Sequence, residues 1–360
     1  VVVVTFRIHE NDPYLGLLRV DNSDMNWLYP YVDQIIFTAI TMFNDYNLNE
    51  ASEKLLEYVV MKDSIKYLLA KAKILLNKKE YDSVIEITDE VISKEKSNYN
   101  AWMLRGIAYY YKKNLFDSEE SFVKAVRFKP EKKENYNIKM LYKLGMTYVK
   151  RKTWADAKTV FTQILKIEPG FAFAWRYLGL AMMRLHEFES AEEALNEANL
   201  LDIENEQVWA YLTILCLLTG RKNQALECLS ELTKKNYSDA ENLEEIGNLF
   251  FEFEEYELTA ELYQKVLSIN PSNTMLYLNL ADLYYLKLKS RKVEAIELLK
   301  QSLKYAEDEN ERLRINAIIE SFSKEIGGGD LHLSNVEDKL KDSSVVTDFN
   351  LNMEDEPFEI

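Results

Sequence analysis

The side chains that most often carry chemistry in proteins are few and widely separated in this chain. There are three histidines, His9, His186 and His332, and none has metal-ligand spacing to a cysteine or to another histidine. The stretch Thr219-Gly220-Arg221-Lys222 lacks the upstream glycine and the hydroxyl residue of a phosphate-binding loop. Because no residue set fills the roles that catalysis requires, the sequence predicts a protein that is not an enzyme and that holds no metal or cofactor.

The two cysteines, Cys216 and Cys228, both lie within helical patterns. Their positions predict packed, reduced thiols on successive helices, as is usual in a cytosolic compartment. A disulfide between them is the alternative interpretation.

Charge is distributed unevenly along the chain, and this favours the chemistry of recognition. Residues 123–184 hold 14 Lys/Arg against 4 Asp/Glu, a balance of +10, whereas residues 185–261 hold 4 against 19, a balance of −15. Surfaces with one sign of charge attract partners of the other sign. The alternative is that these charges only keep outer helix faces in water. Which interpretation holds depends on where these charges lie on the secondary-structure elements that carry them.

Those elements form a repeat, seen most clearly in residues 172–209. Trp175 opens an apolar stripe with Leu178 and Gly179, and a second stripe containing Ala191 and Leu195 follows a polar break. Trp209 then restarts the pattern. Two amphipathic helices with small residues at their crossing, repeated about every 34 residues, are the pattern of a tetratricopeptide repeat (TPR).

The same frame extends in both directions along the chain. It predicts an all-α fold, a right-handed TPR superhelix (α-solenoid) of about eight helix-turn-helix repeats, because one such pair cannot bury its apolar face alone. About five residues are inserted in the polar run 131–137 between two of the units. The units are headed by Ile35, Leu68, Trp102, Leu141, Trp175, Trp209, Leu243 and Tyr277.

The repeat divides the chain into four parts. Residues 1–30 do not fit it, and the β-branched run in residues 1–8 predicts either a linker or the last strand of an upstream β domain. Residues 31–308 form the TPR array, and residues 309–326 form a capping helix with a polar face. Residues 327–360 form an acidic tail with few apolar residues, predicted to be disordered.

The TPR resemblance implies where partners bind, since the first helix of each pair lines the concave groove of such arrays. Carried onto this chain, the groove positions are rich in basic and aromatic residues in the middle units and in glutamates farther on. We expect the first set to bind acidic protein segments, with the chain's own acidic tail as a further candidate occupant. The groove residues are Tyr110, Lys139, Tyr142, Lys143, Met146, Lys150, Phe173, Arg176, Tyr177 and Arg184, and the second, acidic surface consists of Glu241, Glu244, Glu245 and Glu252.

Several classes of partner are excluded or disfavoured. A net charge of −16 makes binding to nucleic acid or to an anionic membrane unexpected, and no run of about 20 apolar residues is present to span a bilayer. TPR domains that bind chaperones clamp two carboxylates with Lys and Asn at set positions. Tyr142 and Met146 occupy those positions in one unit and Glu244 and Asn248 in another, so a co-chaperone role is disfavoured.

The stretch from Phe171 to Cys216 resembles one family more closely than it resembles the general repeat. The segments AEEAL (residues 191–195), EAN (197–199) and VWAYL (208–212) are similar to the C-terminal repeats of the cilia- and flagella-associated protein seventy family. That resemblance implies an axonemal protein of the ciliary central apparatus that contributes to ciliary motility, located in the cytoplasm, cytoskeleton and cilium. It implies axonemal or microtubule-associated proteins as partners.

Two alternatives to a ciliary scaffold remain at this point. One is a soluble cytosolic TPR adaptor of the intraflagellar-transport or ubiquitin-ligase type. The other is the repeat region of an enzyme whose catalytic domain lies outside this sequence.

Overall fold

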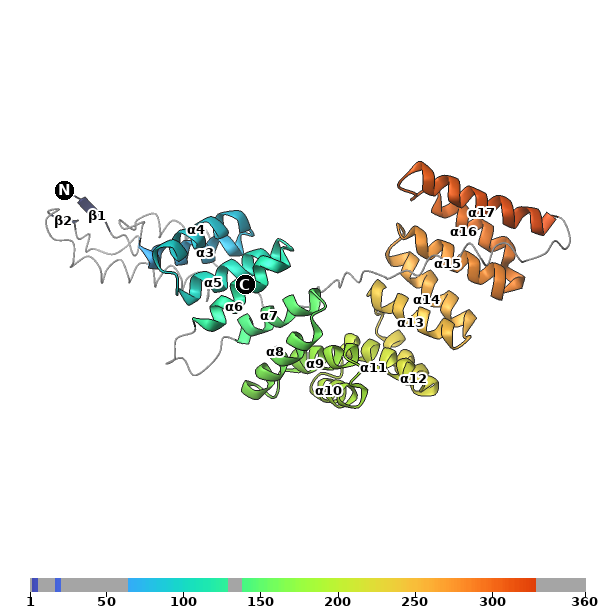
Figure 1. Cartoon of the computed structure of the whole chain (residues 1–360), viewed down its shortest axis with the longest axis horizontal. Helices are drawn as coiled ribbons and strands as arrows, with labels where there is room; N and C mark the ends of the chain where they lie inside the picture. Colours follow the sequence, from blue (N-terminus) through green and yellow to red (C-terminus); the bar gives the residue numbers. More distant parts are fainter. Residues whose placement is uncertain (1, 6–16, 21–63, 129–137, 328–360) are drawn as a thin grey trace. The chain divides into compact units, whose positions relative to one another are not determined.

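The computed structural model describes residues 2–5, 17–20, 64–128 and 138–327 (Figure 1). The chain divides into two compact units, and the division falls between Thr153 and Trp154. Three sequence expectations lie outside the described residues: the weak unit headed by Ile35, the insertion at 131–137, and the acidic tail beyond residue 327. None of the described helices is both long and apolar enough to cross a bilayer.

The described part of the first unit contains a short β-hairpin and five helices. Strand β1 (Val2–Thr5) pairs antiparallel with β2 (Leu17–Val20), with Val2 opposite Val20. The sequence predicts strand character in residues 1–8, and β1 lies there, but it gives no signal for β2. The helices of this unit are α3 (Ile65–Asn77), α4 (Tyr81–Lys94), α5 (Tyr99–Tyr111), α6 (Leu115–Arg127) and α7 (Ile138–Lys150).

The second unit is helical throughout its described part. Successive helices pack as antiparallel neighbours, most closely α9 with α10, α11 with α12 and α13 with α14 (Figure 1). Its elements are α8 (Trp154–Ile167), α9 (Ala172–Arg184), α10 (Phe188–Leu201), α11 (Glu206–Leu218), α12 (Lys222–Lys234), α13 (Ala240–Glu252), α14 (Tyr256–Ile269), α15 (Thr274–Asp282), the π-helical turn η2 (Leu283–Lys287), the short 3₁₀ turn η3 (Lys289–Arg291), α16 (Lys292–Ser302) and α17 (Glu309–Gly327).

Helix starts follow the repeat frame. From Ile138 onward, Ala172, Glu206, Ala240 and Thr274 each open a first helix one repeat length after the previous one, and Ile65 and Tyr99 show the same spacing. Short polar side chains mark several of these starts. Ser64, Asn98, Asp239 and Asn273 each accept a hydrogen bond from a backbone N–H of the first turn, the usual N-cap arrangement. The described residues thus hold the helices of seven of the eight predicted units. The all-α TPR prediction is confirmed.

Three tryptophans make the same contact in different units, which shows that the units are structurally equivalent. The indole Nε1 of Trp102 donates to the carbonyl of Lys96 at 2.8 Å, and that of Trp175 donates to the carbonyl of Pro169 at the same distance. Trp209 does so to the carbonyl of Ile203 at 3.4 Å. In each case the acceptor lies six residues upstream, so the bond ties the loop before a first helix to that helix.

Gly179 is small because α9 and α10 cross at its position. A Cβ atom placed there would lie 2.6 Å from Cγ of Leu195 and 3.2 Å from the backbone oxygen of Ala191. Real Cβ atoms do not approach other atoms so closely, so any larger residue would push the pair apart. The small crossing residue predicted from the sequence is therefore confirmed.

Helix α17 packs against α16 in the second unit. The ring of Phe322 stacks on that of Tyr285 with 3.7 Å between centroids, and the Tyr285 hydroxyl donates to Glu325. Phe322 and Ile315 are buried, whereas Leu313 is 59% exposed. The helix therefore covers the last pair with one face and meets solvent with the other.

Candidate functional site

The most distinctive polar arrangement of the first unit is a lysine–tyrosine cluster, formed by Tyr110, Tyr111, Lys143 and Lys150. Nζ of Lys143 donates to the Tyr111 hydroxyl at 2.9 Å and lies 5.3 Å from the Tyr110 ring centroid. Nζ of Lys150 lies 4.2 Å from the same Tyr110 centroid. Both ammonium groups thus lie within the range in which a cation is attracted to an aromatic face.

Helix periodicity brings these side chains together. Lys143 and Lys150 are two turns apart on α7, so both project from one face of that helix. Tyr110 and Tyr111 end α5, which packs on α7. Behind them, Tyr81 of α4 stacks on Tyr111 with 5.6 Å between ring centroids. Aromatic rings therefore line the side of the cluster on which the lysines rest.

Burial lowers the pKa values of the two lysines. It lowers the pKa of Lys143 to about 7, with a further contribution from the charge of Lys150. Burial together with the charge of Lys113 lowers the pKa of Lys150 to about 8. Burial, together with an electrostatic contribution from Tyr81, raises the pKa of Tyr111 to about 12. An anion placed beside the lysines would restore their charge, so the cluster is electrostatically suited to a carboxylate.

The other predicted groove residues of the first unit differ in exposure. Lys139 is exposed at the start of α7. Tyr142 and Met146 are fully buried, and Tyr110 is almost fully buried. The structure therefore brings Tyr110, Lys143 and Lys150 together. Tyr110 and Lys143 are buried like Tyr142 and Met146, and Lys150 is partly exposed.

In the second unit, two predicted groove residues of α9, Phe173 and Tyr177, lie beside the buried guanidinium of Arg176. This group donates to Asn205 Oδ1 at 2.9 Å and to the Tyr177 hydroxyl at 3.0 Å. It also lies 4.9 Å from the Phe173 ring centroid and 4.7 Å from that of Tyr177. Arg176 is only 1% exposed, so it mainly organises the interior of the unit.

Arg184, at the end of α9, forms a bidentate ion pair with Glu245 of α13. The two N–H···O distances are 2.5 and 2.6 Å, and both side chains are largely buried. Burial opposes the charge of the guanidinium, but the hydrogen bonds and charge of Glu245 outweigh it and raise the pKa of Arg184. The sequence assigns these residues to two separate surfaces, one basic and one acidic, and the structure joins them in one contact.

The remaining glutamates of the predicted acidic surface lie on α13 in different settings. Glu252 is exposed, whereas Glu241 and Glu244 are half-buried. Glu244 accepts a hydrogen bond from Asn273 at 3.2 Å. Burial raises the pKa of Glu244, and the bond from Asn273 opposes that rise.

A polar network between α11 and the start of α13 was not predicted from the sequence. The side chain of Asn242 donates to the Tyr237 hydroxyl at 2.7 Å, and that hydroxyl donates to Gln207 Oε1 at 3.1 Å. Gln207 in turn donates to Asp239 at 3.2 Å. The repeat itself carried a signal, because Gln207 occupies the position in its unit that Phe173 and Glu241 occupy in the units on either side. The network ties the start of α11 to the start of α13.

The described residues offer little else that resembles reactive chemistry. Within these segments, no group of three or more His, Cys, Asp and Glu is placed to hold a metal ion. Cys216 and Cys228 are free thiols. Their side chains share a hydrogen bond, which lowers the pKa of Cys216 and raises that of Cys228. His186 is exposed in the turn between α9 and α10 with a φ of 61°.

A comparison with protein families places this chain. The family model described as "Cilia and flagella-associated protein 70 C-terminal domain" matches residues 48–318. The chain belongs to the cilia- and flagella-associated protein 70 family. The human protein of that name is 31% identical over 186 residues, which is 52% of this chain and 16% of the human protein. The protein from Macaca fascicularis is 38% identical over 107 residues, 30% of this chain and 10% of that protein. The matched part thus spans only a small share of either relative.

Solved structures agree with the family on the fold. A tetratricopeptide repeat protein from Parabacteroides merdae superposes with a TM-score of 0.53 and 16% sequence identity, covering 71% of this chain and 97% of that protein. At so low an identity the likeness concerns the fold alone. Taken together, the family and the fold identify a member of the cilia- and flagella-associated protein 70 family built from TPRs, a module for protein–protein interaction.

Proposed function

We propose that this chain is a non-catalytic scaffold that docks protein partners in the ciliary axoneme, within the central apparatus, and so contributes to ciliary motility. Family membership over residues 48–318 supports the ciliary setting. The TPR fold supports a role in protein–protein interaction. The lysine–tyrosine cluster is the observation that carries the mechanism, since it offers cations and aromatic faces together.

The cluster docks acidic segments of axonemal or microtubule-associated proteins. A carboxylate that approaches Lys143 and Lys150 raises their lowered pKa values, so binding and protonation favour each other. Tyr111, which is partly exposed, supplies a flat aromatic face, and tyrosines are typical anchors at interfaces. Exposed Lys139, on the same helix, adds long-range attraction that speeds encounter.

The acidic tail is a second candidate occupant of the same cluster. Residues 330–360 carry nine carboxylates against Lys339 and Lys341, and the end of this tail includes an aromatic residue, Phe358, directly before Glu359. A tethered segment competes at high effective concentration with any partner in solution. Truncation after Gly329 should therefore strengthen the binding of an acidic peptide. Unchanged affinity after truncation would remove the tail from this role.

A direct binding experiment tests the site. The chain truncated after Gly329 is titrated with a labelled peptide of the tail sequence EDEPFEI. We expect the double variant Lys143→Met/Lys150→Met to weaken binding by roughly tenfold or more, the loss expected for hydrogen bonds to charged groups. The charge-matched control is Lys96→Met/Lys166→Met, which removes two exposed lysines elsewhere. An equal loss in both double variants would mean that net charge alone drives binding, and would contradict the site.

A cellular experiment tests the setting. Ciliated cells that lack their own copy express the tagged protein, and their axonemes are isolated and washed at high salt. We expect the protein to stay with the axoneme and ciliary beating to recover. If the protein instead leaves the axoneme in the wash, and if cells that lack the protein beat normally, the cytosolic adaptor would be favoured.

A further inference from the structure

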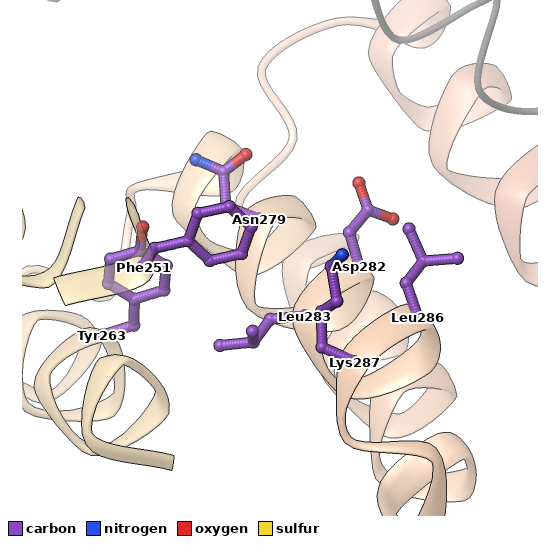
Figure 2. Close-up of a pocket in the computed structure, with 7 residues that line it drawn as sticks. All are labelled: Phe251, Tyr263, Asn279, Asp282, Leu283, Leu286 and Lys287. Carbon is purple, nitrogen blue, oxygen red and sulfur yellow. The ribbon is translucent and has the colours of Figure 1, made fainter. Parts of the chain in front are cut away.

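The second unit contains a pocket that the docking role above does not use. It has a volume of about 410 Å³ and is lined by Phe251, Tyr263, Asn279, Asp282, Leu283, Leu286 and Lys287 (Figure 2). Its volume lies within the range of roughly 300–1,000 Å³ that is usual for ligand pockets. Phe251 and Tyr263 come from α13 and α14, and the other five residues follow one another along α15 and η2.

A π-helical turn shapes one wall of the pocket. Helix α15 ends at Asp282 and continues as η2, where the N–H of Leu288 bonds to the carbonyl of Leu283 at 3.0 Å, five residues back. Single π turns within helices occur often at functional sites because they re-aim side chains. Here the turn carries Leu283, Leu286 and Lys287 onto the face that holds Asp282.

Asp282 supplies the carboxylate among the residues that line this pocket. Its side chain is half-buried, and no described residue forms a hydrogen bond or an ion pair with it. Burial raises the pKa of its carboxyl to about 6, and the more distant charge of Arg314 opposes the rise. A carboxylate that has lost water without gaining a partner is stabilised when a cation or a hydrogen-bond donor enters.

The neighbouring side chains restrict which cation fits. Lys287 forms no hydrogen bond or ion pair with Asp282, and its Nζ lies 5.6 Å from the ring centroid of Tyr256. The Tyr263 hydroxyl donates to Asn248, so its position is fixed and its ring lines the cavity. Phe251 is 39% exposed and supplies a second ring at the pocket. The site therefore combines one carboxylate with two aromatic rings and the amide of Asn279.

We propose that this pocket binds an arginine side chain of a partner protein. A guanidinium presents a planar set of donors that can bond a carboxylate in a bidentate manner, and it stacks on aromatic rings. Asp282 takes the donors, Phe251 and Tyr263 flank the plane, and the amide oxygen of Asn279 accepts from a remaining N–H. The inference rests on the docking function proposed above. It adds a second contact site, which binds a cationic side chain, whereas the lysine–tyrosine cluster binds carboxylates.

The charge on the α13 side of the pocket agrees with this assignment. Residues 185–261, which include the whole of α13, carry a balance of −15, and Glu244 and Glu252 lie on the same helix as Phe251. Such a surface attracts a basic segment before the pocket selects one of its side chains. Lys287 lines the pocket and the charge of Arg314 reaches Asp282, so these two basic groups limit the site to one cationic side chain.

The experiment uses the chain labelled for NMR at its leucine methyl groups. The probe is the capped peptide Ac-Ala-Arg-Ala-NH₂, and its control is the same peptide with citrulline, which keeps the shape and loses the charge. We expect saturable shifts confined to Leu283, Leu286 and their neighbours for the arginine peptide. Citrulline should bind at least tenfold more weakly. Asp282→Asn should weaken arginine binding at least tenfold, while Glu297→Gln, which removes an exposed carboxylate on α16, should leave it unchanged.

Three results would overturn the proposal. They are equal binding of the citrulline peptide, shifts spread over the acidic surface with equal loss in both variants, and no saturable shift at all. The methyl spectrum of each variant also reports whether it is folded, and Phe251→Leu serves as a second variant that keeps the charge and removes a ring. Because the acidic-peptide titration uses residues of the other unit, failure here leaves that proposed function standing, and the reverse also holds.

Discussion

Arg184 and Glu245 are 61 residues apart in sequence and form a bidentate ion pair with N–H···O distances of 2.5 and 2.6 Å. Arg184 ends α9 and Glu245 lies on α13, so the pair links two first helices that are separated by a third, α11. Both α9 and α13 contact α11. The pair therefore ties three consecutive repeats of the second unit together, in addition to the apolar packing between neighbours.

Removing one partner of this pair should destabilise the second unit. Arg184→Met leaves a largely buried carboxylate without its guanidinium, and we expect a loss of roughly 2–4 kcal/mol in the free energy of unfolding. Urea unfolding of the chain measures it. The exposed pair Lys234–Glu231 is the control, because Lys234→Met should cost less than about 1 kcal/mol. Equal costs at the two sites would contradict a structural role for Arg184.

The close crossing at Gly179 gives a second prediction. Gly179→Ala places a Cβ atom 2.6 Å from Leu195 Cγ, so we expect destabilisation of roughly 1–3 kcal/mol. Gly170→Ala is the matched control, since no atom lies within 4 Å of the added carbon, and it should change stability by about 0.5 kcal/mol or less. Adding Leu195→Ala to Gly179→Ala should cost less than the sum of the two single changes. Strict additivity would show that the two residues do not meet.

Binding of acidic peptides should depend on pH through the lysine–tyrosine cluster. The pKa values of about 7 for Lys143 and about 8 for Lys150 mean that both are largely neutral at pH 9 and largely charged at pH 6. The carboxylates of the peptide remain ionised over that range. Affinity should therefore rise as pH falls from 9 to 6, by roughly tenfold for each pKa unit that binding restores.

Fluorescence anisotropy at a series of pH values measures this dependence. Lys143→Met/Lys150→Met should flatten the profile, whereas Lys96→Met/Lys166→Met should keep it. A profile that is already flat in the unmodified chain would contradict the cluster as the site.

The last helix should protect its neighbours from solvent. Phe322→Ala removes the ring that stacks on Tyr285, and we expect a cost of roughly 3–5 kcal/mol, which is usual for a buried phenylalanine. Hydrogen exchange should accelerate in α15 and α16 and stay unchanged in α3–α6. Leu313→Ala, an exposed position on the same helix, should have little effect. Faster exchange throughout the chain would contradict the local role of α17.

The sequence predicted the features that repeat and missed the features that do not. The spacing of Trp175 and Trp209 was enough to place the helices, because each pair must bury the same stripe against its neighbours. The π turn at Leu283 breaks the frame, and no residue there signals it. The partner of Arg184 was missed because a contact between α9 and α13 depends on how three repeats stack, which local patterns do not specify.

Site residues were harder to predict than helices for a related reason. Groove positions were transferred from the repeat, and two of them, Lys143 and Lys150, lie on one face of α7. Exposure was not predictable in this way. Tyr142 occupies a groove position but is fully buried, since burial depends on the size of side chains on neighbouring elements. The pocket at Asp282 was missed because its walls come from α13, α14 and η2, which lie in successive repeats.

Zero-length crosslinking of lysines to carboxylates in native axonemes, read by mass spectrometry, tests the docking claim most directly. The account predicts that Lys139 and Lys150 link to aspartates or glutamates of other axonemal proteins, and that these links disappear at high salt. It would be contradicted if Lys139 and Lys150 formed no such links while the exposed lysines Lys96 and Lys166 did.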